Sequence, residues 1–430
     1  MFHLSRVIQA VRRNSDRLAL LILGVALGVR VVIALVQSTY GLSGIPWLAL
    51  SAWGDFNGVY IPWLSLVQHG YLPYRDFYTY KYTPLFLYVL YPFYSAAAQA
   101  ASIPIVLADA ATAVCVYLLA KTVTGPRIAF AAAMVYALSP FVLYYEDYLW
   151  LSSQPMALFI VLAIYLLNTD RPLLSSASLA VAVMFKQEAV FVLPAYVILY
   201  VRSHGKKVLP GLIVFLAVVF VVSFPFLILA PRDYLFVLSY YPFFGVIPAS
   251  QLEPGLVGAL TTSASSGLTG YTPQACGVQT IPGLYTGTIC GSIINLQEFA
   301  SSIVLGKLNQ IGFILSPLLL ALLAPALSSV RKAPNFSQML CTYSLLGGFV
   351  AFSTFVEPSL AYYFVPVYAL MFAAIVDVRS LALAIATALL SLILPEGPYQ
   401  VILPIGYLFG LVLLQDATRS RQFELTATSA

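Results

Sequence analysis

The residues best suited to chemistry lie in one stretch, 53–85, which is dense in tyrosine, proline and charged side chains. It contains Trp53-Gly54-Asp55-Phe56, then Gly70-Tyr71-Leu72-Pro73-Tyr74-Arg75-Asp76, then Thr79-Tyr80-Lys81-Tyr82-Thr83-Pro84-Leu85. A lone carboxylate such as Asp55 can accept a proton, and cations such as Lys81 can hold an anion. The competing interpretation is an aromatic belt at a membrane surface, with cations whose stems lie along apolar groups. On residue types alone, the belt is slightly favoured.

Several common catalytic patterns are missing from the chain. No glycine-rich loop ends in Lys-Ser or Lys-Thr, and no Gly-x-Ser-x-Gly elbow occurs. The histidines His3, His69 and His204 are scattered, which argues against a histidine-based metal site. The basic residues form no stripe and no long run, so nucleic acid is not an expected partner.

The composition indicates that these residues are carried by a membrane protein. Of the 430 residues, 61% are hydrophobic and only 9% are charged, whereas a soluble domain carries about a quarter charged residues. In lipid every backbone polar group must be satisfied internally, which leaves helices or a closed barrel. Because the apolar stretches are long continuous runs, we expect a polytopic all-α membrane protein forming one domain over 1–430.

About twelve membrane-spanning helices are predicted, each from an apolar run close to the length that crosses a bilayer. They lie near 18–38, 103–120, 128–144, 153–168, 172–186, 189–201, 208–230, 306–329, 338–355, 361–376, 380–394 and 399–415. The apolar, aromatic segment 84–98 is expected to be a helix lying at the membrane interface, because a span there would break the alternation of basic and acidic segments between spans.

The distribution of basic residues predicts the orientation. With the N-terminus in the cytoplasm, fifteen of the 21 Lys and Arg residues fall on the cytoplasmic face. The C-terminus is then cytoplasmic too, as expected for an integral membrane protein with twelve spans. Ten of the sixteen acidic residues fall on the outer face: Asp55, Asp76, Glu146, Asp147, Glu188, Asp233, Glu253, Glu298, Glu357 and Glu396. Several of these punctuate apolar helix ends, where an unneeded charge is costly.

Two outer segments are large. The first outer loop, 39–102, contains the motif-rich stretch 53–85 and is expected to hold interfacial helices and the active site. The second, 231–305, is rich in Gly, Ser and Thr and carries Cys276 and Cys290, for which a disulfide is plausible on an oxidising face. Cys115 and Cys341 fall inside spans and are expected to be small core residues.

The motif order in the first outer loop resembles the GT-C glycosyltransferase superfamily. The order is Asp55, then Gly70-Tyr71-Leu72-Pro73-Tyr74, then Thr79-Tyr80-Lys81-Tyr82-Thr83-Pro84-Leu85. It is most similar to the branch with the GPI-type first mannosyltransferase and its prokaryotic polyprenyl-phosphate-sugar relatives. Arg30, Glu146-Asp147 and Phe185-Lys186-Gln187 resemble features seen across the superfamily. The family often pairs the first-loop acid with a neighbouring acid, whereas Asp55 stands between Gly54 and Phe56.

The resemblance implies transfer of a hexose, mannose as the first candidate, from a polyprenyl-phosphate donor to an acceptor hydroxyl on the outer face, with inversion. Asp55 would be the general base, and Lys81, Lys186 and then Arg75 would bind the donor phosphate. The acceptor would be a glycan, lipid or protein. A divalent metal is compatible with such a site, but no residue pattern indicates one, and no other cofactor is expected. Candidate substrate-binding residues are Asp76, Tyr82, Glu146, Asp147, Gln187, Glu357, Tyr362 and Tyr363.

A secondary transporter or a flippase for lipid-linked sugars is the alternative, because it too would have about twelve spans. Transporters are built from related halves with charges near the bilayer midplane. No internal repeat is visible here, and most charges within spans lie near their outer ends; Arg30 and Asp109, midway along its predicted span, are the exceptions. A non-catalytic scaffold would leave the outer charges unexplained. The motif in the first outer loop favours the transferase.

Overall fold

The computed structural model describes residues 17–40, 56–76, 80, 82–231, 233–235, 238, 365–375 and 377–393. Within these ranges every regular element is helical. Most of the second outer loop, with Cys276 and Cys290, lies outside the described residues, as do the predicted spans 306–329, 338–355 and 399–415. An all-helical fold is therefore confirmed for the part of the chain that can be described, and the count of twelve spans stays a prediction.

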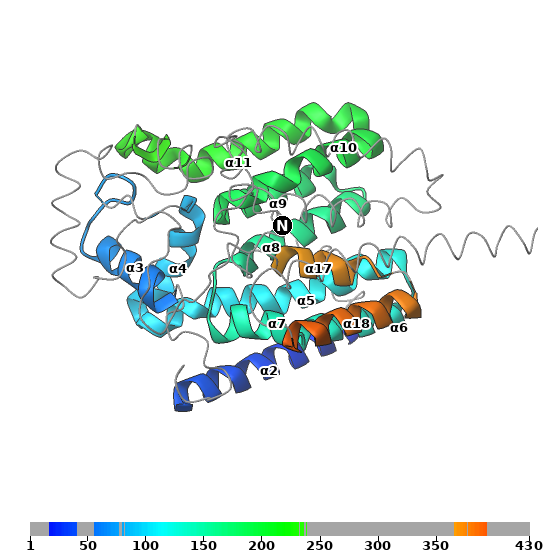
Figure 1. Cartoon of the computed structure of the whole chain (residues 1–430). Helices are drawn as coiled ribbons and strands as arrows, with labels where there is room; N and C mark the ends of the chain where they lie inside the picture. Colours follow the sequence, from blue (N-terminus) through cyan, green and yellow to red (C-terminus); the bar gives the residue numbers. More distant parts are fainter. Residues whose placement is uncertain are drawn as a thin grey trace, which may run out of the picture.

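The described helices form an antiparallel stack with a small helical cap at one end (Figure 1). The long α2 lies along one edge of the stack and α11 along the opposite edge, while α3 and α4 make the cap. We call the end of the stack next to this cap the α3–α4 end. The α-helices are α2 (Arg17–Tyr40), α3 (Ile61–Gln68), α4 (Pro84–Ala96), α5 (Ile103–Val123), α6 (Pro126–Ala137), α7 (Pro140–Val142), α8 (Ser153–Asn168), α9 (Pro172–Phe185), α10 (Leu193–His204), α11 (Val208–Leu229), α17 (Val365–Ala373) and α18 (Val378–Ile393).

Short 3-10 and π-helical segments join these helices. They are η2 (Phe56–Tyr60) and η4 (Leu143–Tyr148), which are π-helical, and η3 (Ala98–Ser102), η5 (Gln187–Val192) and η6 (Gly205–Lys207), which are 3-10. Proline opens α4, α6 and α9, where its missing N–H costs no helical hydrogen bond. The segment predicted as a span at 189–201 begins as η5 and becomes α-helical only from Leu193.

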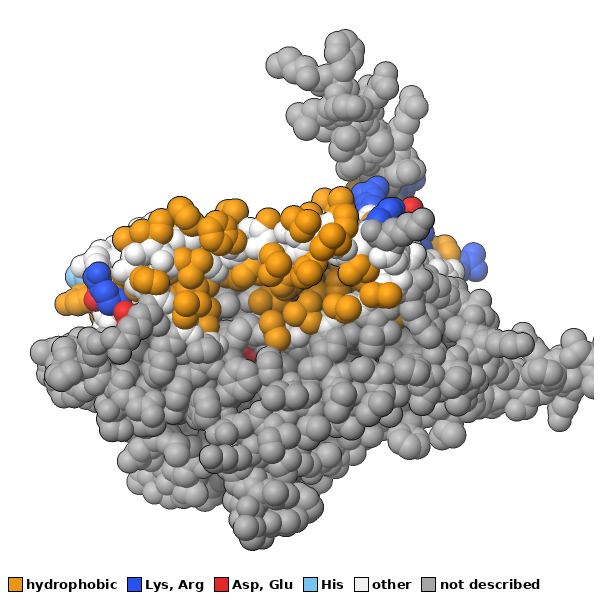
Figure 2. Space-filling view, turned by 90° about the horizontal axis from the view of Figure 1, so that it is seen from above, with side chains coloured by type: hydrophobic (Ala, Val, Ile, Leu, Met, Phe, Trp, Pro, Cys, Tyr) orange, Lys and Arg blue, Asp and Glu red, His pale blue; other side chains and the backbone are white. Residues whose placement is uncertain are grey.

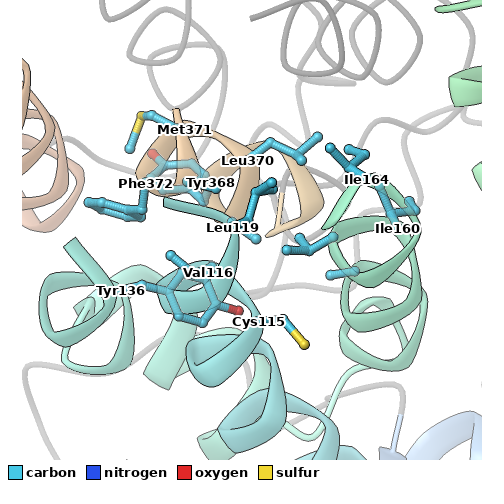
Figure 3. Packing of buried hydrophobic residues seen from close by; sticks show 14 of the residues in the cluster. Cys115, Val116, Leu119, Tyr136, Ile160, Ile164, Tyr368, Leu370, Met371 and Phe372 are labelled. Atoms are coloured by element: carbon cyan, nitrogen blue, oxygen red, sulfur yellow. The ribbon is translucent and has the colours of Figure 1, made fainter. Parts of the chain in front are cut away.

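The core of the stack is formed by α5, α6, α8 and the distant segment α17 (Figure 3). Every residue of α17 is buried. Tyr368 stacks on Phe141 with 4.2 Å between ring centres, and Phe372 meets Tyr136 edge to face at 6.1 Å. The predicted span 361–376 therefore contains a helix, and that helix is enclosed by protein where the structure describes it.

Four described helical segments are long and apolar enough to cross a membrane: Arg17–Gln37, Ala98–Thr122, Pro126–Tyr145 and Val208–Leu229. They match the predicted spans at 18–38, 103–120, 128–144 and 208–230. Shorter apolar helices cover Ser153–Asn168, Pro172–Phe185 and Val378–Leu390, where three more spans were predicted, and Pro84–Tyr94, where an interfacial helix was predicted. The chain is an integral membrane protein.

The outward face of α11 has the character expected of a surface in contact with lipid. Val221 is 69% exposed and Leu209 66% exposed, and other large side chains along the helix are similarly open. Figure 2 shows hydrophobic side chains across the middle of this face, with Lys and Arg only near its two ends. Such a surface would be unusual for a soluble monomer but is ordinary when the solvent is hydrocarbon.

On its inward face, α11 comes close to α9 and α10 at Gly211. A Cβ built on Gly211 would overlap the Tyr200 hydroxyl and lie only 2.8 Å from Ser176 Oγ. We expect Gly211→Ala to destabilise the protein by about 1–3 kcal/mol, because the rigid tyrosine ring cannot yield without moving a helix. Thermal unfolding in detergent measures this.

Gly28→Ala is the matched control, since nothing lies within 4 Å of the Cβ built at this glycine of α2. Its stability should change by less than about 1 kcal/mol. Equal behaviour of the two variants would show that the close approach at Gly211 is not needed for packing.

Candidate active site

A buried cluster of three charges joins α2, α5 and η4 near the α3–α4 end. Arg30 Nε lies 2.9 Å from Asp109 Oδ2, and Arg30 Nη2 donates to the same oxygen. Arg30 Nε is also 3.3 Å from Asp147 Oδ2. All three side chains are closed to solvent. One guanidinium therefore faces two carboxylates, in surroundings where an unbalanced charge is very costly.

Further hydrogen bonds complete this cluster. Arg30 Nη1 donates to the backbone carbonyls of Ala26, at 2.9 Å, and Ala137, at 3.2 Å. Tyr136 donates its hydroxyl proton to Asp109 Oδ1 at 2.9 Å, and Gln154 Nε2 donates to the same oxygen. The network thus includes residues of α6 and α8 as well, and it fixes how five elements meet.

Asp109 lies midway along the apolar segment Ala98–Thr122, as predicted from the sequence. Asp109 is the seventh residue of α5, Ala137 is the last of α6, and Gln154 is the second of α8. The network around Arg30 and Asp109 therefore joins the middle of this segment to the last residue of α6 and the start of α8.

The motif tyrosines of the first outer loop form an aromatic cluster beneath the cap. Tyr60, Trp63, Tyr80, Tyr82 and Phe86 meet edge to face, with ring centres 4.9–6.3 Å apart for the pairs in contact. This geometry is the favoured one for aromatic rings. These side chains are buried in the protein, so they do not form a belt at the membrane surface.

Hydrogen bonds fix the aromatic cluster to the stack. The Tyr74 hydroxyl donates to the carbonyl of Tyr82 at 2.7 Å, and the Tyr80 hydroxyl donates to the carbonyl of Thr83 at 2.8 Å. Thr83 Oγ1 in turn donates to the carbonyl of Val183 in α9 at 2.8 Å. Tyr74 and Tyr80 therefore act as anchors of the loop.

Lys186, directly after α9, meets this aromatic cluster. Its side chain is fully buried. Its Nζ lies 3.3 Å from Ser153 Oγ and 5.2 Å from the centre of the Tyr82 ring. An ammonium over an aromatic face is attracted by the ring quadrupole, more strongly where water is excluded. The structure thus brings Lys186 and Tyr82, two predicted site residues about 100 positions apart, into contact.

Three consecutive residues at the start of α8 connect these features. The backbone N–H of Ser152 donates to the Tyr60 hydroxyl at 3.2 Å, Ser153 Oγ contacts Lys186, and Gln154 binds Asp109. All three are fully buried. This junction, residues 152–154, ties the aromatic cluster, the lysine and the charge cluster to one helix end.

Arg75 and Asp76 form a separate brace on the surface of the loop. Arg75 Nε donates to Asp76 Oδ1 at 2.8 Å, and the Leu72 N–H donates to Asp76 Oδ2 at 2.7 Å. Gly70 and Tyr74 take left-handed backbone conformations in this turn, with φ of 86° and 70°. The Arg75 side chain is 54% exposed, in contrast to the buried Lys186.

Several predicted site residues lie outside the described part of the chain: Asp55, Lys81, Glu357, Tyr362 and Tyr363. For Asp55 and Lys81, the structure describes the residue that follows each in the chain. Phe56, which follows Asp55, packs on Trp150 with 4.8 Å between ring centres, and Tyr82 follows Lys81. Glu146 lies in η4 next to Asp147, and Gln187, half-buried, follows Lys186.

Sequence reasoning missed Tyr136 and Gln154, which complete the hydrogen bonding of Asp109. Tyr136 did not stand out, because tyrosines are frequent along the whole chain and most of them need no functional role. Gln154 follows two serines at the start of an apolar run, and that run of polar residues was the available signal. Among the described residues, no group of three or more His, Cys, Asp or Glu side chains could hold a metal ion.

The charge cluster predicts unequal effects for its members. Arg30→Met would leave two buried carboxylates facing each other without a cation, which we expect to cost about 3–5 kcal/mol. Asp109→Asn would keep the Arg30–Asp147 pair and lose only hydrogen bonds to an ionised group, at about 1–3 kcal/mol. Thermal unfolding and the yield of monodisperse protein distinguish the two. Similar losses in both variants would contradict this charge balance.

The surface brace predicts a dependence on pH. The hydrogen bond from Arg75 holds the pKa of Asp76 below its ordinary value, and the Leu72 N–H acts in the same direction. A carboxyl whose pKa is lowered by folding stabilises the fold above its unfolded pKa of about 4, and this contribution disappears as pH falls through the lowered value. The wild type should therefore exceed Asp76→Asn in thermal stability at neutral pH, with the difference closing below about pH 4. A constant difference would contradict the assignment.

One family model matches the central part of the chain. Residues 83–229, about a third of the chain, match the family model of dolichyl-phosphate-mannose-protein mannosyltransferase. Among curated proteins, no significant match is found.

Similar solved structures include the oligosaccharyltransferase of Archaeoglobus fulgidus in its apo form, at 14% identity and a TM-score of 0.46 over 92% of this chain and 55% of that one. The same enzyme tethered to an acceptor peptide has 15% identity and a TM-score of 0.48 over 92% and 54%. Its complex with an inhibitory peptide and dolichol-phosphate has 14% identity and a TM-score of 0.45 over 95% and 56%. The chain thus spans just over half the length of these proteins.

The family match begins at Thr83, inside the last motif of the first outer loop, and continues to the end of α11. Most of it lies beyond the stretch on which the resemblance rested, and it includes Asp109, Asp147, Gln154 and Lys186. The resemblance of this chain to the GT-C glycosyltransferase superfamily is thereby confirmed, through a match to a mannosyltransferase family that includes both carboxylates of the charge cluster and the lysine but not Arg30.

Proposed function

We propose that this chain is a membrane glycosyltransferase that moves a hexose, mannose as the first candidate, from a polyprenyl-phosphate donor to an acceptor hydroxyl, with inversion at the anomeric carbon. The observation that carries the proposal is the mannosyltransferase family match over residues 83–229. Within that region Lys186 is buried against Tyr82 of the loop motif. A fixed cation beside the motif is what departure of a lipid phosphate requires.

In the proposed reaction the acceptor oxygen attacks the anomeric carbon, and the bond between that carbon and the phosphate oxygen breaks. The electron pair of this bond leaves with the polyprenyl phosphate. The acceptor proton passes to the carboxylate of Asp55, which acts as general base. Because the transition state resembles an oxocarbenium ion, the attacking hydroxyl needs little activation, and a carboxylate is basic enough.

The developing negative charge on the phosphate is the main electrostatic demand of this reaction. Lys186 is a strong candidate to meet it, because its position is fixed by Ser153 and by the Tyr82 ring, so little reorganisation is needed as the bond breaks. Lys81, adjacent to Tyr82 in the chain, is the second candidate. Arg75 ranks third, since Asp76 already accepts two of its hydrogen bonds at the surface.

Substrate contacts are proposed for residues near this lysine. Gln187 follows Lys186, while Tyr82 lies beneath it. Glu146 and Asp147 are adjacent in η4, and the pairing of Asp147 with Arg30 fixes the position of that segment. The more distant candidates Asp76, Glu357, Tyr362 and Tyr363 keep this role as part of the proposal.

We also propose that the α3–α4 end faces the outside of the cell membrane and that both termini are cytoplasmic. The antiparallel stack supports this orientation, because Lys121 in the last turn of α5, Arg127 at the start of α6 and Arg171 before α9 all lie at the opposite end. Basic residues favour the cytoplasmic side. A transporter is less well supported, because transporters are built from related halves and no internal repeat is visible in the sequence.

The first test is sugar transfer in liposomes by the wild type and Asp55→Asn. The donors are a panel of polyprenyl-phosphate sugars beginning with mannose, and the acceptor is a lipid extract. We expect product with the wild type and a loss of about 10²–10⁴-fold in the variant, which keeps the shape of the side chain but cannot accept the proton.

Asp170→Asn is the control, because Asp170 is an exposed acid at the opposite end of the stack; its turnover should equal that of the wild type. Turnover by Asp55→Asn at the wild-type rate would move the base elsewhere, with Asp76, Glu146 and Asp147 next in order. No turnover by the wild type with any donor would overturn the proposed function.

A further inference from the structure

Buried polar atoms without a partner gather at the start of α8 and the end of α9. In the described part of the chain, neither carboxylate oxygen of Glu188 has a hydrogen-bond partner, nor do Trp150 Nε1 and Ser152 Oγ. Glu188 is 4% exposed and Ser152 is fully buried. Native proteins pair almost all such atoms, because a buried unpaired carboxylate or N–H loses its hydration without compensation.

These atoms belong to two segments that are in direct contact. Lys186 Nζ lies 3.3 Å from Ser153 Oγ, so residues 150–153 and 186–188 meet at this point. The ring of Trp150 packs on Phe56, the residue that follows Asp55. Trp150 therefore packs on the residue that follows the proposed base, and Ser152 and Glu188 lie within two residues in sequence of the Ser153–Lys186 contact. The charge cluster around Arg30 uses other side chains.

The mixture of donors and acceptors indicates the chemistry of the ligand. Trp150 Nε1 can only donate, the Glu188 carboxylate can only accept, and Ser152 Oγ can do both. An anion would not pair with Glu188, and a metal ion would not pair with the indole N–H. A ligand with several hydroxyl groups matches all three, because each hydroxyl both donates and accepts.

We propose that Glu188, Ser152 and Trp150 bind the hydroxyl groups of the transferred sugar, with Glu188 accepting from the ring hydroxyls and determining which sugar is used. This inference rests on the proposed function for the identity of the ligand as a sugar. The three groups are closed to solvent in this structure, so a sugar bound to them would be shielded from water.

The test compares thermal shifts of wild type and Glu188→Gln. Without ligand, Glu188→Gln should unfold about 2 °C or more above the wild type, because the substitution removes a buried carboxylate whose two oxygens have no hydrogen-bond partner within the described residues. With polyprenyl-phosphate mannose, the wild type should be stabilised more than with polyprenyl phosphate alone. Glu188→Gln should lose that sugar-dependent difference, with affinity for the sugar donor falling about 10- to 100-fold, while its response to polyprenyl phosphate stays the same.

Ser152→Ala is the second variant. It removes only the hydroxyl and keeps the backbone bond to Tyr60, and it should weaken the sugar-dependent shift in the same direction. Asp170→Asn, the same carboxylate-to-amide change at an exposed site, should match the wild type in its sugar-dependent thermal shift. A lower unfolding temperature for Glu188→Gln, or an undiminished sugar-dependent shift, would overturn this inference and leave the proposed function standing. A wild type without any sugar-dependent shift across the donor panel would overturn both.

Discussion

The pairing of one arginine with two carboxylates is the constraint on which the rest of this structure depends. A guanidinium cannot remain in a region closed to water unless its charge and its hydrogen bonds are matched. Arg30 achieves this only if α2, α5 and η4 meet in one relative position. Because Gln154 and Tyr136 complete the hydrogen bonding of Asp109, the start of α8 and the end of α6 are fixed by the same condition.

This constraint also positions the proposed active site. Fixing Gln154 fixes Ser152 and Ser153 beside it, and these contact Tyr60 and Lys186. The aromatic cluster forms a rigid surface under this lysine, because its rings pack edge to face and the hydroxyls of Tyr80 and the neighbouring Tyr74 donate to backbone carbonyls. A buried lysine packed against this aromatic cluster has little freedom to reorient. Electrostatic catalysis requires such a fixed position of a cation. Asp55 is followed in the chain by Phe56, which packs against Tyr60 of this cluster, and Lys81 is followed by Tyr82, a member of the cluster.

The sequence predicted where several helices lie in the chain, but it did not predict the contacts between them. Long apolar runs located α2, α5 and α11 to within a few residues, because the bilayer sets a minimum length for a span. The motif resemblance linked Lys186 to the first outer loop before any contact was known. The Arg30–Asp109–Gln154 network could not be predicted in the same way. It depends on how each of three helices is rotated about its own axis and how far each is shifted along it. Tyr74 and Tyr80 likewise looked suited to an interface, and only tertiary packing decides that they are buried.

Hydrogen-bond partners distinguish among the buried polar residues of the described chain where residue type does not. Arg30, Asp109 and Tyr74 are buried, and their polar atoms form hydrogen bonds with other groups of the protein. Their role is therefore to hold the fold together. Glu188 is just as buried, yet within the described chain its carboxylate binds nothing. The hydrocarbon contains no water that could hydrate such a carboxylate. An unmatched carboxylate there is therefore expected to have a role other than stabilising the fold. Removing it should make the protein more stable and less selective, and a purely structural residue could not show both effects together.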